Sequence, residues 1–363
     1  MKFPLLDHIQ NLSPYQPGKP IKEVERELGL KNTIKLASNE NPLGPSPKAI
    51  KAAKKALKEV HLYPEGGGFY LCEALSKHFN VPSHWIILGN GSVELIEIAA
   101  KAFVYKGLNC VMSEGAFAMY KIATLAMGGE AREVKMRERT HNLKEMAKAI
   151  DQNTRIVMIA NPNNPTGTYN SYVEIKEFVE SVPKNVLVII DEAYKEYITK
   201  EDYKSAQNLI EKHSNLLVLG TFSKAYGLAG LRIGYGFGHP DLLKILHKVR
   251  SPFNTSLVAQ EACIAALDDK DFVRKTVTIN SREMAFVEKE LSKLKIAYTP
   301  SVGNFILIDL PISGKDFFEK LLREGVIVRP MAMSGFPNSA RVTISTRKHN
   351  KRFLTATKKI LNL

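Results

Sequence analysis

Short apolar runs typical of buried strands alternate along this chain with segments of helical periodicity, and that alternation restricts the fold more than any other feature. The expected strands span residues 85–88, 109–112, 155–160, 186–190, 216–219 and 232–237. Expected helices lie between them, for example over residues 94–103 and 172–179. Neighbouring parallel strands need a crossover connection, which is usually a helix. The order therefore predicts an α/β fold whose mostly parallel sheet is covered by helices on both faces.

A second, smaller body is expected beyond residues 251–255, where the composition changes. A long amphipathic stretch follows over residues 257–294, with a break near 268–271. The short strands expected after it mix with helices, which indicates an α+β domain. These strands span residues 304–309, 325–329 and 341–345.

The N-terminal stretch contains Pro4, Pro14, Pro17 and Pro20, so it should run as an extended arm before a short helix. We expect three parts in the chain. Residues 1–36 form the arm and part of the small domain, residues 37–252 the large domain, and residues 253–363 the small C-terminal domain.

The net formal charge of +14 over 363 residues raises the question of a nucleic-acid partner. The lysines of residues 47–59, however, lie on one side of an amphipathic helix, which is typical of a solvated face. The sequence lacks zinc-finger, RNP and leucine-zipper patterns. No apolar run approaches the ~18 residues of a membrane span. We expect neither a nucleic-acid nor a membrane partner.

Cys72, Cys110 and Cys263 are odd in number and far apart, so they predict neither a disulfide framework nor a metal site. The apolar part of the N-terminus is too short for a secretory signal. A reducing cytosol fits best, and we expect a cytoplasmic protein without a metal.

The most informative chemistry lies in residues 216–232. Lys224 comes just after the expected strand 216–219, where burial disfavours its charged form and makes its amine nucleophilic. That is the requirement for a lysine that forms a Schiff base. Thr221, Ser223 and Arg232 beside it are residue types that bind phosphate. The plainer interpretation is a surface lysine after a strand.

Three further polar clusters also begin where an expected strand ends. They span residues 89–94, 161–167 and 191–194. The carboxyl edge of an open α/β sheet is where ligands bind. The joint occurrence of four such clusters is therefore far more specific than any one of them.

Each cluster suits one part of a phosphorylated aromatic aldehyde. Free backbone N–H groups where a helix opens, near Ser92, bind anions, and with Thr221, Ser223 and Arg232 they can form a phosphate cup. Asp191 follows four apolar residues, and a buried carboxylate needs a cationic partner such as a protonated pyridine nitrogen.

The ring itself would need hydrogen bonds and a stacking partner. Tyr194 and Asn164 can bond a ring hydroxyl, and Phe117 can stack on the ring face. Each residue also has a plainer interpretation: residues 161–167 as a turn, Asp191 and Ser92 as helix caps, and Phe117 as core.

These residues resemble a known family. Residues 164–167, 191–194 and 223–224 with Arg232 resemble the signature of fold type I pyridoxal-phosphate aminotransferases, and more narrowly that of histidinol-phosphate aminotransferases. The resemblance covers nearly the whole chain. Further similar segments span residues 13–20, 35–45, 62–68, 221–235, 326–330 and 341–344. It implies a seven-stranded sheet in the large domain and pyridoxal 5'-phosphate as the cofactor.

The resemblance also implies residue roles. Lys224 bonds covalently to the cofactor and shuttles the proton, Asp191 pairs with the pyridine nitrogen, and Tyr194 acts with Asn164 on the ring oxygen. In a homodimer with shared active sites, Tyr63 reaches the cofactor phosphate of the partner subunit. The remaining cofactor contacts are Ser92, Val93, Phe117, Thr221, Ser223 and Arg232.

For the substrate, the resemblance assigns the α-carboxylate of glutamate or 2-oxoglutarate to Arg341. Tyr15, Asn90, Tyr120 and Arg329 are further candidates around a distal phosphate. Two residues depart from the family pattern. Val93 stands where Asp or Asn is usual, a role that a backbone N–H can serve. Gly115 stands where Pro is frequent, which loosens the loop that bears Phe117.

The implied reaction is transamination between histidinol phosphate and 2-oxoglutarate, a step of histidine biosynthesis. An aromatic amino-acid aminotransferase and a threonine-phosphate decarboxylase remain open, because the same cofactor anchors serve them. A regulator that keeps the fold for partner or DNA binding is the non-enzyme alternative. The presence of Lys224 and the lack of room for an added domain in 363 residues count against it.

Overall fold

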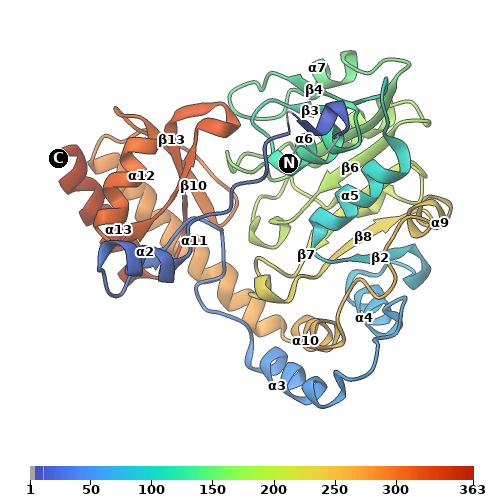
Figure 1. The fold of residues 1–363 in the computed structure, drawn as a ribbon, viewed down its shortest axis with the longest axis horizontal. Helices are drawn as coiled ribbons and strands as arrows, with labels where there is room; N and C mark the ends of the chain where they lie inside the picture. Colours follow the sequence, from blue (N-terminus) through green and yellow to red (C-terminus); the bar gives the residue numbers. More distant parts are fainter. Residues whose placement is uncertain (1–4, 11) are drawn as a thin grey trace.

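A seven-stranded sheet forms the centre of the larger of two bodies in the computed structural model, which describes residues 5–10 and 12–363 (Figure 1). Its strand order is β2-β8-β7-β6-β5-β3-β4. β8 runs antiparallel to both of its neighbours, and the other pairings are parallel. The strands are β2 (Ile86–Gly89), β3 (Asn109–Ser113), β4 (Glu130–Val134), β5 (Thr154–Ala160), β6 (Leu187–Asp191), β7 (Leu216–Thr221) and β8 (Gly234–Gly238).

Six of these strands lie where the sequence predicts them, whereas β4 was not predicted. Its sequence, Glu-Ala-Arg-Glu-Val, contains three charged residues, and none of its five residues is buried. β4 pairs with β3 at the edge of the sheet, where side chains on both faces reach water. An edge strand of this kind carries little of the apolar signal by which central strands are recognised.

Helices cover both faces of the sheet, because the central strands are apolar on both sides. In β5, Val157 and Ile159 enter one core while Ile156 and Met158 enter the other. The first core also takes residues of α3 (Pro47–Ala56), α4 (Phe69–Phe79), α7 (Leu143–Lys148), α8 (Tyr172–Ser181) and α10 (Leu257–Leu267). The second takes residues of α5 (Ser92–Phe103), α6 (Ala118–Ala126) and α9 (Pro240–His247).

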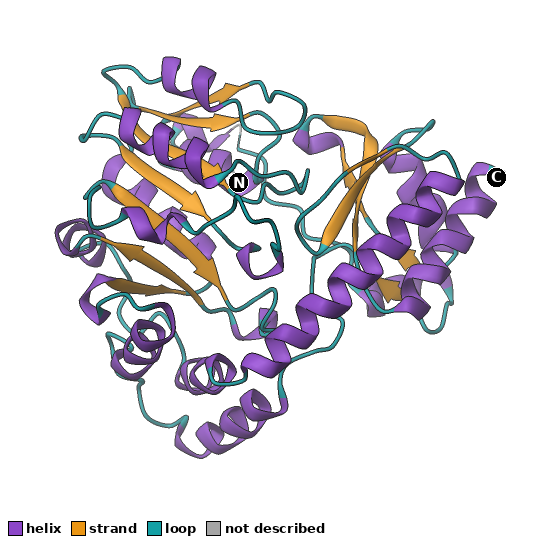
Figure 2. Ribbon diagram, turned by 180° about the vertical axis from the view of Figure 1, so that it is seen from behind, coloured by secondary structure: helices purple, strands orange, loops and turns teal. Residues whose placement is uncertain are grey.

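The smaller body is built on an antiparallel sheet of order β12-β13-β10-β9 (Figure 2). Its strands are β9 (Tyr298–Thr299), β10 (Phe305–Asp309), β12 (Arg329–Met331) and β13 (Phe336–Thr343). A separate pair joins β1 (Ile34–Lys35) to β11 (Val326–Ile327) in parallel. The helices are α2 (Ile21–Leu28), α11 (Lys270–Lys293), α12 (Gly314–Arg323) and α13 (Arg347–Leu361).

Two connections tie the bodies together. α11 begins near the large body and runs into the small one, and the break predicted near residues 268–271 lies between α10 and α11 (Figures 1 and 2). The N-terminal arm holds α1 (Asp7–Gln10), then has no regular structure over residues 12–20, and reaches α2 as predicted. Pro4 lies outside the described residues. The boundary expected at residues 252–253 stays a prediction, and α10 still packs against α3 and α4.

Short 3-10 helices complete the chain. Those at the strand ends are η3 (Lys195–Tyr197) and η5 (Ala229–Leu231). The others are η1 (Leu57–Glu59), η2 (Ser83–Trp85), η4 (Ala206–Leu209) and η6 (Ala332–Ser334).

Candidate active site

The four predicted clusters meet at one edge of the large sheet. The register pairs Ala160 with Asp191 and Thr221 with Gly234, so these strands end level with one another. A cavity of about 550 Å³ opens there between the sheet edge, the N-terminal arm and the small body. Fourteen of the sixteen predicted site residues line it. They are Tyr15, Asn90, Ser92, Val93, Phe117, Asn164, Asp191, Tyr194, Thr221, Ser223, Lys224, Arg232, Arg329 and Arg341.

Lys224 lies three residues beyond the end of β7, with its amine inside the cavity. Nζ donates a hydrogen bond to the carbonyl oxygen of Ser38 at 3.1 Å and lies 5.6 Å from the ring centre of Tyr194. Burial lowers the pKa of Lys224 to about 8, and the positive charge of Arg341 is the second largest cause of this decrease. A sizeable fraction of the amine is therefore neutral and nucleophilic near neutral pH.

Asp191 is the last residue of β6 and is almost fully buried. Burial raises its pKa to about 6, opposed by hydrogen bonds from Tyr120 and from the backbone N–H of Ala193. The Tyr120 hydroxyl donates to Oδ2 at 3.1 Å, and the Ala193 N–H donates to Oδ1 at 3.2 Å. Both donors favour the ionised carboxylate, which can then pair with a cation in the cavity.

Tyr120 corrects one prediction. It was expected beside the substrate, but it is completely buried in the core under α6 and does not line the cavity. Its place at the third position of α6 turns the side chain toward the sheet, where its hydroxyl meets Asp191. Tyr120 thus supports the carboxylate from below.

Tyr194, Asn164 and Arg341 also line the cavity, and hydrogen bonds fix each of them. Asn39 Nδ2 donates to the Tyr194 hydroxyl at 3.0 Å. Arg341 donates to the Asn164 Oδ1 and to the carbonyl oxygen of Ala37. The amide nitrogen of Asn164 remains available as a donor toward the cavity. The Nε of Arg341 is buried without a hydrogen-bond partner among the described residues, so one donor of this guanidinium is unused.

An anion cup forms where α5 begins. No side chain caps this helix, so its first backbone N–H groups are free, including that of Val93. Arg232 lies against Gly91, where an added Cβ would come within 2.3 Å of its guanidinium. A Cβ at Gly234 would come within 2.2 Å of the Ser92 nitrogen. The two glycines therefore let a guanidinium and a helix start converge closely.

Hydroxyl groups complete this cup. Thr221 Oγ1 donates to Ser223 Oγ at 3.1 Å, and Arg232 donates to Ser223 Oγ at 3.3 Å and to the Ala229 carbonyl oxygen at 3.0 Å. The cup therefore brings together neutral donors, a fixed cation and a positive helix terminus. These are the features of a phosphate site.

Phe117 lines the cavity at the start of α6, and Gly115 sets the path of its loop. Gly115 has φ +74°, a conformation that proline cannot adopt. An added Cβ would also come within 2.8 Å of the Ser334 carbonyl oxygen in the small body. Where the family often has proline, this loop therefore follows a different path, and it is closely packed rather than loose.

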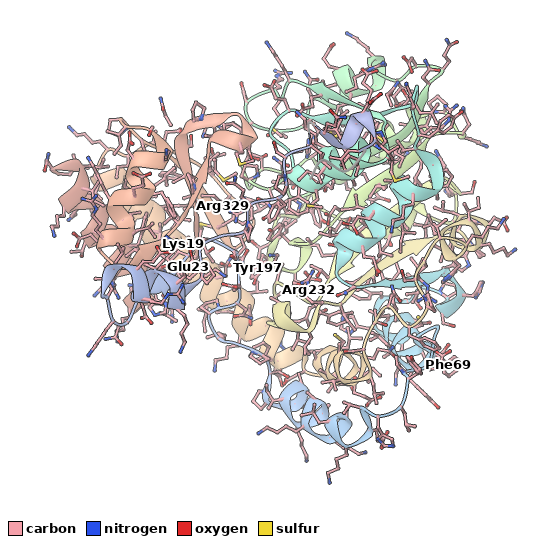
Figure 3. The ribbon with its side chains drawn as sticks, in the orientation of Figure 1. Lys19, Glu23, Phe69, Tyr197, Arg232 and Arg329 are labelled. Atoms are coloured by element: carbon pink, nitrogen blue, oxygen red, sulfur yellow. The ribbon has the colours of Figure 1, made fainter. Side chains whose placement is uncertain are left out.

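Arg329 marks the opening of the cavity. Its guanidinium lies 5.5 Å from the ring centre of Tyr15 and donates to the Gln16 carbonyl oxygen on the arm. Arg329 on the small body and Arg232 on the large body lie on the facing sides of the two bodies (Figure 3). The cavity thus holds cationic groups near its opening and at the anion cup.

Tyr63 does not line this cavity. It is 82% exposed and stacks on Phe253, with ring centres 4.6 Å apart. Phe69, from the same part of the chain, lies at the outer edge of the large body, away from Arg329 (Figure 3). The predicted action of Tyr63 in a neighbouring subunit stays a prediction.

Sequence reasoning missed several residues of the wall. Asn39 is fully buried, has φ +56°, and exchanges hydrogen bonds with Thr343 while it donates to Tyr194. Ser38 accepts from Lys224, and Glu40, Glu97 and Met119 also line the cavity. The only signal for Asn39 was its place in the segment 35–45, which resembles the family.

Within residues 5–10 and 12–363, no helix is long and apolar enough to cross a membrane. The same residues contain no group of three or more His, Cys, Asp or Glu side chains placed to hold a metal ion.

A partly neutral lysine amine, a buried carboxylate and an anion cup at one sheet edge define an enzyme site for covalent chemistry on a phosphorylated ligand. The sequence matches the family "Aminotransferase class I and II" over residues 31–356. It is 47% identical over 355 residues to "Histidinol-phosphate aminotransferase 2" of Pseudomonas fluorescens (strain Pf0-1), covering 97% of this chain and 96% of that protein. It is 46% identical over 356 residues to "Histidinol-phosphate aminotransferase" of Anaeromyxobacter sp. (strain Fw109-5), covering 98% of each.

The solved histidinol-phosphate aminotransferase from Sinorhizobium meliloti, in complex with pyridoxal-5'-phosphate, matches this fold with a TM-score of 0.92 at 24% identity. The alignment covers 99% of this chain and 97% of that one. This chain belongs to the class I and II aminotransferase family. The predicted family and fold class are confirmed.

Proposed function

We propose that this protein is a pyridoxal-phosphate-dependent aminotransferase that transfers the amino group between histidinol phosphate and 2-oxoglutarate, giving imidazole-acetol phosphate and glutamate in histidine biosynthesis. Two full-length relatives at 46–47% identity carry the name histidinol-phosphate aminotransferase. The observation that carries the proposal is the distribution of charge. Arg341 lies inside the cavity next to Lys224 and Arg329 lines the same cavity beside Tyr15, so a carboxylate of one substrate and the phosphate of the other can each meet an arginine.

The residues present fit pyridoxal phosphate. The uncapped start of α5, with Arg232, Ser223 and Thr221, would hold the phosphate. Asp191 would pair with the pyridine nitrogen, Asn164 and Tyr194 would bond the ring oxygen, and Phe117 would stack on the ring face. When bound, the cofactor supplies an aldehyde for amines and a ring that accepts electrons.

Lys224 has two tasks, to bind covalently and to move a proton. With its pKa lowered to about 8, the amine can take a proton at Nζ and return it near neutral pH. The Ser38 carbonyl oxygen accepts from Nζ and fixes its position. Burial makes the Asp191 carboxylate, held by Tyr120 and Ala193, a strong partner for a cationic ring nitrogen.

Substrate selection follows from the two arginines. The guanidinium of Arg341 would bind the α-carboxylate of glutamate or 2-oxoglutarate. Arg329, stacked on Tyr15, would bind the phosphate of histidinol phosphate together with Asn90. Each half-reaction would then use a different arginine.

The test is a steady-state comparison of histidinol phosphate, histidinol, phenylalanine, tyrosine and threonine phosphate as substrates with 2-oxoglutarate. Histidinol phosphate should have the highest kcat/KM, and histidinol should be poor because it lacks the phosphate. A preference for phenylalanine or tyrosine would instead identify an aromatic amino-acid aminotransferase. Release of carbon dioxide from threonine phosphate would identify a decarboxylase.

A homodimer with shared active sites is part of the proposal. Exposed apolar side chains recur from the end of α3 to the first turn of α4, with Tyr63 82% and Tyr70 67% exposed. An apolar surface of this kind favours association, and two-fold symmetry would place Tyr63 reciprocally at each partner's cup. The members of this apolar surface are Leu57, Val60, Leu62, Tyr63, Phe69 and Tyr70.

We propose the division into residues 1–36, 37–252 and 253–363, which is supported by β1 joining the arm to the small body. Within the last part, α10 packs on the large body, so the small body itself is built from the residues after α10. A cytoplasmic location is supported by three free, buried cysteines, Cys72, Cys110 and Cys263.

A further inference from the structure

Directly behind the active site, on the far side of the turn that carries Asp191 and Tyr194, lies a buried ammonium group. The side chain of Lys195 is only 9% exposed, and its Nζ has no hydrogen-bond partner among the described residues. Three aromatic rings surround it instead. The centres of Phe79, Tyr235 and Phe237 lie 4.4, 5.4 and 5.5 Å from Nζ. Rings attract a desolvated cation through their negative faces. We call these three rings and Lys195 the aromatic cage.

The counter-ion of Lys195 comes from the same turn. A carboxylate oxygen of Glu192 lies 3.7 Å from Nζ, and the Glu192 side chain is 1% exposed. That carboxylate also accepts from the Ser205 hydroxyl at 2.5 Å and from the Ala206 N–H at 2.7 Å. Glu192 is therefore fixed to the segment that follows η3, and the ammonium balances its buried charge.

The two faces of the turn have different tasks. Asp191 and Tyr194 line the cavity, whereas Glu192 and Lys195 point to the opposite side. The backbone holds these residues in one rigid unit: Glu192 N–H donates to the Leu219 carbonyl oxygen on β7, and Lys195 N–H donates to the Glu192 carbonyl oxygen. A movement of Lys195 would therefore move Tyr194 and the end of β6.

The cage also reaches the strands that carry the anion cup. Tyr235 lies opposite Gly220 and Phe237 lies opposite Val218 in the β7–β8 register. Gly220 comes just before Thr221 of the cup. The caged cation thus packs against β8 and indirectly against β7, while it is covalently part of the turn after β6.

We propose that Lys195 is a positioning residue for transamination: its caged ammonium, paired with Glu192, fixes the turn after β6 so that Asp191 and Tyr194 stay aimed at the cofactor ring. The inference rests on the proposed function. A purely structural ion pair would contribute to stability alone. If the pair positions the turn, its loss must also change how Asp191 and Tyr194 contact the ring. That change would alter kcat and the absorbance of the cofactor.

The main variant is Lys195→Met, which keeps the length and apolar stem but removes the charge. In the holoenzyme we expect kcat to fall about ten- to a hundredfold, the range for a small misplacement of reacting groups. The KM for glutamate should stay essentially unchanged, because Arg341 is untouched. The midpoint of the pH titration of the bound cofactor's absorbance should shift.

Lys204→Met is the matched control. Lys204 also lies near an aromatic ring, with its ammonium 5.8 Å from the ring centre of Tyr172, but it is exposed and is not among the residues that line the cavity. Its kcat and absorbance titration should match those of the unmodified protein. Because Lys195→Met leaves Glu192 buried and unpaired, it could fail to fold. Phe79→Leu keeps the ion pair and removes the nearest ring, and it should change kcat in the same direction to a smaller extent.

Two results would overturn the proposal. One is a folded, cofactor-bound Lys195→Met protein, or Phe79→Leu protein if the first does not fold, whose kcat and absorbance titration are unchanged. The other is an equal loss of kcat in Lys204→Met. Failure of the proposed function would look different: the unmodified protein would transaminate no donor, while the absorbance titrations would still test the position of the turn.

Discussion

Replacing Asp191 by asparagine should make the cofactor-free protein more stable at neutral pH and at the same time remove nearly all transamination. The carboxyl is the last residue of a completely buried strand, and burial raises its pKa from 3.8 to about 6. The unfolded chain releases this proton near pH 3.8, whereas the folded chain holds it to about pH 6. Ionised Asp191 therefore lowers the stability of the folded protein.

The size of this effect follows from the pKa difference. A pKa difference of about two units lowers the free energy of unfolding by about 3 kcal/mol at a pH where Asp191 is ionised in both the folded and the unfolded chain. The deficit is absent below the unfolded pKa, grows as the pH rises between the two values, and is complete above the folded pKa. Asparagine has no charge to desolvate, and its amide oxygen can still accept from Tyr120. Its amide nitrogen cannot accept from the Ala193 N–H, a pH-independent loss that makes the net gain smaller than this figure.

The assay is urea unfolding of the cofactor-free protein at about pH 4 and about pH 7.5. Asp191→Asn should gain stability at the higher pH and gain little at the lower one. Asp241→Asn is the control, because the exposed Asp241 has a pKa lowered by its pairing with Lys244 and should show no gain. A gain equal at both pH values, or a loss at the higher pH, would refute the reasoning. In the holoenzyme, kcat should fall about a hundredfold or more, since a buried charge pair is broken.

Three other changes have definite expected outcomes. Tyr120→Phe removes a hydrogen-bond donor 3.1 Å from the Asp191 carboxylate, so the pH below which cofactor affinity falls should rise by about one to two units. Fluorescence titration of cofactor binding measures this pH, and an unchanged pH dependence would show that Tyr120 does not stabilise the ionised carboxylate. Arg329→Gln should raise the KM for histidinol phosphate about tenfold or more and the KM for glutamate little, because only histidinol phosphate places a phosphate near Arg329. Equal changes in both KM values would count against Arg329 as the residue that binds the phosphate. Mixing Tyr63→Phe protein with Lys224→Ala protein should restore one native site per mixed dimer, and demonstrated subunit exchange without recovered activity would show that Tyr63 does not act in trans.

Apolar strands and the clusters at their ends were predictable because both are local features of the sequence. The runs at residues 155–160 and 216–219 are buried on both faces, so they are apolar throughout. The register of a parallel sheet then brings Asp191 and Thr221 to the same edge. The predicted residues at the strand ends line one cavity for this reason, whereas Tyr15, Arg329 and Arg341 reach it from the arm and the small body and were predicted only from the family resemblance.

The rest depended on contacts between distant segments. Tyr120 was expected at the substrate, but its hydroxyl bonds Asp191, 71 residues away in sequence. Asn39 bonds Thr343 and Tyr194, and neither contact has a local pattern. The positive φ of Gly115 reflects packing against Ser334 and Phe336 of the other body. None of these partners could be chosen from spacing alone.

The central claim is that Lys224 bonds covalently to pyridoxal phosphate. The most direct measurement is reduction of the cofactor-loaded protein with borohydride, followed by digestion and mass spectrometry of the modified peptide. The cofactor should be fixed to Lys224 alone, and Lys224→Ala should carry no stable adduct. An adduct on another lysine, or none on a protein that binds the cofactor, would contradict the account.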